Sequence, residues 1–84
     1  MKDIEARLEI GMVATVEAAR VEKDAWKKQR DFLEFESVAH KDEPAVLSQI
    51  KELRQSAEER YCEWQREEEL RRKALKAWRE HNEG

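Results

Sequence analysis

The chain has 84 residues, 44% of them charged and 39% hydrophobic, with two glycines and one proline. This composition excludes more than one small domain and is typical of long helices or coiled coils. A net charge of −3 is too small for a polyanion mimic, and no apolar run is long enough to cross a membrane. A single cysteine cannot form an internal disulfide, so we expect a cytoplasmic protein.

The first element in chain order is a helix expected over about residues 3–39. Residues 4–16 also alternate in polarity as a strand would, but their Ala, Glu, Leu and Met favour a helix, and no other segment offers a partner strand. The apolar residues of this helix form two stripes. The stripe expected to face the second helix contains Ile4, Leu8, Met12, Ala19, Trp26 and Leu33. A flanking stripe contains Ile10, Ala14, Val21, Ala25 and Phe32.

The next element is a short turn at residues 40–43, where the only proline follows closely. Pro44 suits a first helical turn, and we expect Asp42 to cap the second helix. The turn divides the chain into two nearly equal rods of roughly 55 Å each. Equal rods joined by a short loop predict an antiparallel helical hairpin.

The second helix is expected over about residues 44–82, with one narrow apolar face. This face is made by Val46, Leu47, Ile50, Leu53, Ala57, Tyr61 and Trp64. We expect it to lapse at Glu67, Glu68 and Arg71 and to resume at Leu75 and Trp78. Pairs of acid and base four residues apart, such as Glu67–Arg71 and Glu68–Arg72, favour a solvated helix there.

The position of the turn sets the register between the two helices. Leu33 is expected opposite Ile50, Trp26 opposite Ala57, Ala19 opposite Trp64 and Leu8 opposite Leu75, so that each tryptophan meets an alanine. Glu22 is expected to be buried beside Arg60 and Tyr61. Gly11, on the side of Leu8 and Met12, is expected to allow the two helices to approach closely.

The flanking stripe of the first helix has no cover in a monomer, because one partner helix covers about one seam. A second copy is the simplest cover, which predicts a homodimer, a four-helix bundle made of two hairpins. The expected oligomer interface is Ile10, Ala14, Val21, Ala25 and Phe32.

No group of residues predicts catalysis, a metal site or a cofactor. Cys62 has no base near it along the rod, and His40 and His81 lie at opposite ends of the second half. We therefore expect a protein that is not an enzyme.

Three functional hypotheses remain. The first is a self-associating interaction module that acts on an unidentified protein partner as a small accessory inhibitor or adaptor, of the kind that phages and mobile elements encode. The residues expected to contact that partner are Trp78, Arg71, Arg72, Lys73, Glu67 and Glu68. The second is a nucleic-acid-associated regulator that uses basic clusters brought together on the dimer. Its expected contact residues are Arg20, Lys23, Lys27, Lys28 and Arg30. The third is a structural subunit of a larger assembly.

Overall fold

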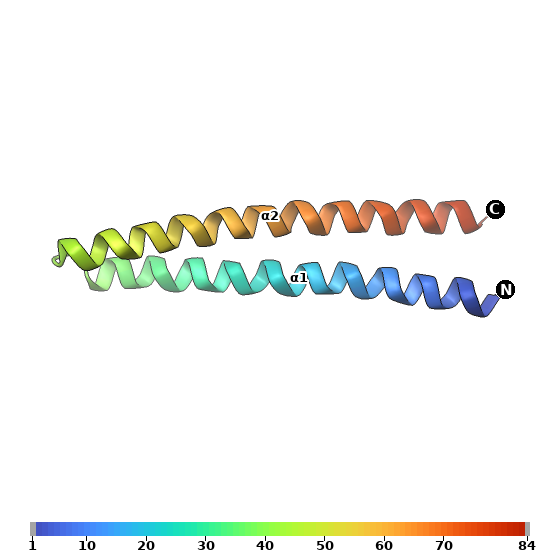
Figure 1. Ribbon diagram of the computed structural model, residues 1–84, viewed down its shortest axis with the longest axis horizontal. Coiled ribbons are helices and arrows are strands. Elements are labelled where there is room, and N and C mark those ends of the chain that lie inside the picture. Colours follow the sequence, from blue (N-terminus) through green and yellow to red (C-terminus); the bar gives the residue numbers. More distant parts are fainter. Residues whose placement is uncertain (1, 84) are drawn as a thin grey trace.

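The structure is a computed structural model that describes residues 2–83, with the side chains of residues 3–82. It contains two α-helices, α1 (Lys2–Ala39) and α2 (Pro44–Glu83), which lie side by side as an antiparallel hairpin with both ends of the chain at the same pole (Figure 1). The molecule measures 63 × 16 × 13 Å and is therefore one helix pair thick. The expected all-α hairpin is confirmed, and residues 4–16 are helical rather than extended.

α2 begins at Pro44, as the sequence predicted, but its capping residue lies one position later than expected. The carbonyl of Glu43 accepts the first helical hydrogen bond, from the amide of Leu47 at 2.8 Å, and Pro44 takes the first helical position. Glu43 rather than Asp42 is therefore the capping residue. Proline explains the shift, because its fixed backbone suits the first helical position and its missing amide would have no partner there.

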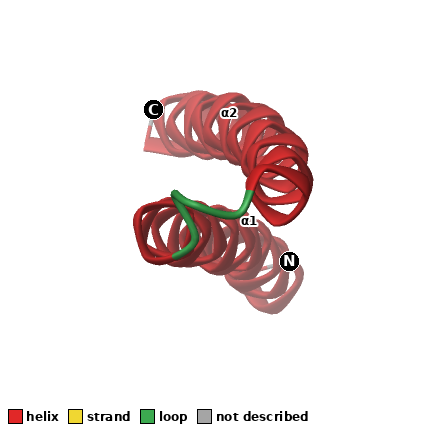
Figure 2. Cartoon of the chain, turned by 90° about the vertical axis from the view of Figure 1, so that its left-hand side faces the viewer, coloured by secondary structure: helices red, strands yellow, loops and turns green. Residues whose placement is uncertain are grey.

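A continuous seam with three- and four-residue spacing joins the two helices. On α1 the seam positions run from Glu9 to Ser37 and continue to His40 in the turn, and on α2 they run from Leu47 to Trp78. Every residue at these positions is buried or half-buried. A repeat of seven residues requires the helices to wind about each other, as Figure 2 shows in the view along the hairpin. The seam does not lapse at Glu68 and Arg71, as the sequence had suggested, but passes through both of them.

The apolar core is small and lies toward the turn. Leu33, Ile50 and Ala57 form one buried cluster, and Trp26 packs against it. These four residues are those that the register placed together in the two layers nearest the turn. Farther from the turn, the buried apolar residues among residues 3–82 are Ala19 and Leu75.

Contacts between the helices are displaced along the axis from the expected register, because of the direction in which the side chains point. Arg79 Nε lies 2.7 Å from Glu9 Oε1, and Arg54 Nη2 lies 2.7 Å from Glu34 Oε2. In each pair the α2 residue lies about one helical turn farther toward the C-terminus of α2 than the residue that the register places opposite its α1 partner. Side chains in a helix lean toward its N-terminus, so side chains on antiparallel helices lean toward each other along the axis.

Several expected seam contacts are wrong, because the seam follows other positions of α1 than those expected. Ile4 and Leu8 are at least half exposed, because the seam on α1 continues from Met12 to Glu9 and leaves both at its edge. Glu22 is exposed rather than buried beside Tyr61. Gly11 is also exposed, and a Cβ atom built there would meet nothing within 4 Å, so it does not serve close approach of α2.

The buried cluster near the turn predicts a large effect of Leu33→Ala. Leu33 is 6% exposed, so its truncation should lower the free energy of unfolding by about 2–5 kcal/mol, measured by urea denaturation followed by circular dichroism. Leu53→Ala is the matched control because Leu53 is 57% exposed, and it should change stability by less than about 0.5 kcal/mol. Equal losses of unfolding free energy in the two variants would show that Leu33 is not packed in the seam.

The turn predicts a dependence of stability on pH through His40. Its ring nitrogens lie 3.0 Å from Glu43 Oε2 and 3.2 Å from Glu36 Oε2, and the hydrogen bond with Glu43 raises the pKa of His40 above its ordinary value of 6.5. The stabilisation is complete below pH 6.5 and is lost as the pH rises through the raised value. Melting curves from pH 6 upward should therefore show a decline that His40→Gln removes and His81→Gln retains.

Candidate interaction surface

The main apolar surface of the molecule lies on α1, on the side away from α2. Eight residues repeat there at three- and four-residue steps and all are exposed; we call them the outer stripe: Gly11, Ala14, Ala18, Val21, Ala25, Lys28, Phe32 and Phe35. By the 3.6-residue helical period, the outer stripe lies about half a turn around α1 from the seam. The sequence placed this second apolar stripe beside the first one, and the structure places it nearly opposite.

Four of the five residues expected at an oligomer interface belong to the outer stripe, namely Ala14, Val21, Ala25 and Phe32, and Ile10 lies at its border. All five are exposed in the single chain. The stripe expected from the sequence lacked the other four residues, Gly11, Ala18, Lys28 and Phe35. Continuing the three- and four-residue spacing in both directions from Val21 would have found them.

The exposed aromatic residues make the outer stripe costly to leave in water. Phe32 is 56% exposed, Phe35 is 71% exposed, and Val21 is 56% exposed. Covering each such side chain contributes on the order of 1.5–3 kcal/mol. An apolar face of this length is typical of a surface that another chain covers.

The borders of the outer stripe are acidic. Five carboxylates occupy the positions next to it on either side: Glu17, Glu22, Asp24, Asp31 and Glu36. Lys28 is the only charged member of the stripe itself. A polar rim around an apolar centre is the usual composition of a protein interface.

A buried ionic group lies in the seam, in the half of the hairpin away from the turn. The side chain of Glu68 is only 3% exposed; its Oε1 accepts a hydrogen bond from Lys23 Nζ at 2.7 Å, and its Oε2 lies 2.6 Å from Arg72 Nη2. The Arg72 contact is an ion pair without hydrogen-bond alignment, since Oε2 has no hydrogen-bond partner. The hydrogen bond that Lys23 donates to Glu68 raises the pKa of Lys23, so its ammonium group stays charged.

Two arginines extend the ionic contacts along the seam. Arg30 Nη1 donates to Glu58 at 3.0 Å, and its guanidinium lies 4.9 Å from the centre of the Tyr61 ring. Arg71 Nη1 donates to the backbone carbonyl of Thr15 at 2.8 Å. Its guanidinium also lies 5.6 Å from the Trp64 ring centre. Both arginines therefore serve the hairpin itself.

These contacts occupy much of the surface predicted to bind a protein partner. Glu68 is buried and Arg72 pairs with it, while Arg71 pairs with Glu67 at 2.9 Å and also contacts α1. Lys73 is exposed and Trp78 is half-buried at the seam. Of that predicted surface, Lys73 and Trp78 make no ion pair with the side chains of residues 3–82, while Arg72 is exposed and pairs with Glu68.

The basic cluster expected to bind nucleic acid is largely neutralised within the chain. Arg20 pairs with Glu17 and with Asp24, and Lys23 pairs with Glu68. Arg30 is likewise held by Glu58 and Asp31. Lys27 and Lys28 are exposed and make no ion pair with the side chains of residues 3–82. The cluster does not present the continuous positive stripe that a phosphate backbone requires.

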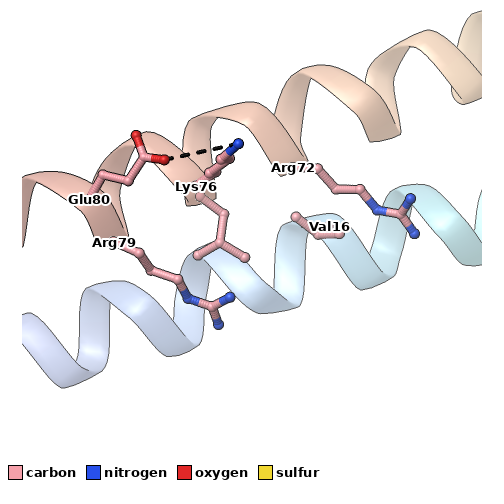
Figure 3. A pocket seen from close by; sticks show the side chains of 6 residues that line it. Val16, Arg72, Lys76, Arg79 and Glu80 are labelled. Carbon is pink, nitrogen blue, oxygen red and sulfur yellow. Dashed lines mark ion pairs between the residues drawn. The ribbon is translucent and has the colours of Figure 1, made fainter. Parts of the chain in front are cut away.

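An open groove lies between the helices toward the ends of the chain (Figure 3). It is lined by Val16, Arg72, Leu75, Lys76, Arg79 and Glu80. Figure 3 shows Arg72 and Arg79 extending from α2 toward α1. Each cation of the groove pairs with an acid of the same chain: Arg72–Glu68, Lys76–Glu80 and Arg79–Glu9. Every cation of the groove therefore lies beside an acid of the same chain, and Arg72 shares its acid, Glu68, with Lys23.

The candidates for chemistry are dispersed. Cys62 is half-buried, and its Sγ lies 3.9 Å from Glu58 Oε1. Within the described part of the chain, no three His, Cys, Asp or Glu side chains gather closely enough to hold a metal ion. Neither described helix has a stretch apolar enough to span a membrane.

Comparison of the chain with protein-family models, with curated proteins and with solved structures gives no match.

The buried ionic group predicts that Lys23 and Glu68 tolerate substitution unequally. Lys23→Met leaves the buried Glu68 carboxylate with Arg72 alone and should lower the free energy of unfolding by about 1–3 kcal/mol. Glu68→Leu fills the same space with an apolar side chain, and Arg72 is 59% exposed and can turn to water, so the loss should stay below about 1 kcal/mol. Chemical denaturation of both variants measures this difference. A larger loss of unfolding free energy for Glu68→Leu than for Lys23→Met would contradict this prediction and show that the ionic group stabilises the seam.

Proposed function

We propose that this protein is a non-enzymatic interaction module that works by self-association through the outer face of α1. The observation that carries the proposal is the outer stripe, an exposed apolar face on the side of α1 that α2 does not touch. The opposite face of α1 is already covered by α2, and most cations near it pair with acids of the same chain. The outer stripe is therefore the surface best suited to bind another polypeptide.

A second copy is the proposed partner at this face, and the dimer is the proposed working form. A role as a small inhibitor or adaptor is a further part of the proposal. Lys73 and the exposed edge of Trp78, at the far end of α2, would then contact the protein target, because amphipathic aromatic side chains are frequent anchors of protein interfaces.

The proposal predicts twice the mass of the chain by light scattering coupled to size exclusion. Val21→Asp should reduce the association constant at least about 100-fold, since it places a charge in the centre of the covered face. Circular dichroism should show that the variant remains helical.

Leu70→Asp is the control for the Val21 variant. Leu70 is 62% exposed on α2, outside the outer stripe, so the same change there should leave the dimer intact. A wild-type chain that remains monomeric up to about 0.1 mM would overturn the proposal.

A further inference from the structure

The outer stripe is self-complementary in size when it runs antiparallel to itself. Its small residues, Gly11 and Ala14, lie toward one end, and its aromatic residues, Phe32 and Phe35, lie toward the other. We infer that α1 pairs with α1 of a second copy in antiparallel orientation, with the two-fold axis level with Lys23. This inference rests on the function proposed above. In a parallel pair the aromatic residues would meet each other and the small residues would face a gap, which a packed interface does not tolerate.

The antiparallel register follows from the spacing of the stripe. With the two-fold axis at residue 23, all eight stripe positions face stripe positions of the other copy. Gly11 faces the second copy's Phe35, and Ala14 faces its Phe32. Val21 faces Ala25 in the same way, so every large residue meets a small one. A shift of one heptad brings Phe32 opposite Arg7 or Val21 and leaves part of the stripe uncovered.

The charges agree with the same register. Lys28 faces Ala18 of the other copy, over which its aliphatic stem can lie. Its ammonium group then comes level with the second copy's Glu22, one turn farther along. This one-turn offset is the one seen in the hairpin itself between Arg79 and Glu9 and between Arg54 and Glu34. Lys28 and Glu22 are both exposed, and neither pairs with a side chain among residues 3–82.

The position of the outer stripe determines the shape of the dimer. In a square four-helix bundle, each helix meets its two neighbours on faces about a quarter turn apart. The outer stripe and the seam lie about half a turn apart on α1. The four helices of the dimer therefore form a flat layer, in which the two copies of α1 lie in the middle and the two copies of α2 lie outside. This arrangement replaces the compact bundle that the sequence suggested.

An exchange of side-chain size between positions 14 and 32 tests the pairing. Phe32→Ala alone should weaken the dimer at least about 100-fold, and Ala14→Phe alone by about tenfold or more, both measured by sedimentation equilibrium. The double variant Ala14→Phe, Phe32→Ala restores a large residue opposite a small one. Its dissociation constant should return to within about tenfold of the wild-type value.

The control is the double variant Ala25→Phe, Phe32→Ala, which makes the same exchange at a position that faces Val21 and should not restore the dimer. Circular dichroism of each variant establishes that the helices form. A wild-type dimer in which the 14/32 exchange gives no rescue would overturn the antiparallel pairing while leaving self-association standing. A wild-type monomer would overturn both.

Discussion

A pair of helices that touch only each other can cover one narrow stripe on each partner, and the rest of this structure depends on that limit. With a thickness of 16 × 13 Å, the molecule has no interior beyond its single seam. Most of the large apolar side chains in the seam are only half-buried, and among residues 3–82 only Leu33, Ile50 and Leu75 are buried. Apolar surface that lies elsewhere on either helix has no cover within the chain.

Charged side chains of α1 lie in its inward seam, while an apolar stripe lies on its outward face. Its inward face includes Lys23 and Arg30, which are held by acids from α2, while its outward face includes Val21 and Phe32. Buried ion pairs contribute little net stability, but they penalise alternative alignments, because a shift of one helix would leave a buried charge without its partner. The ionic seam thus specifies how α2 lies on α1, and the apolar face remains for association.

The helices and the turn could be predicted from the sequence because they depend on local preferences: few breakers, one proline near the midpoint and regular apolar spacing. Which face of each helix lies inward could not be predicted in this way. Apolar content pointed to Ile4 and Leu8 as seam residues, whereas the seam follows the heptad positions of Glu9 and Lys23, whose charges are satisfied only by α2. Whether a charged side chain is buried depends on a partner far along the chain. A helical wheel of one helix alone does not contain that information.

Because both ends of the chain lie at one pole and the turn lies at the other, tension applied between the ends would act across the seam rather than along it (Figure 1). The helices would peel apart one layer after another instead of sliding as a whole. The ionic contacts of Arg79 and Arg71 would separate first, and the cluster around Leu33 would separate last. Such a hairpin yields at low force from its ends, although the same seam would resist a pull parallel to its axis.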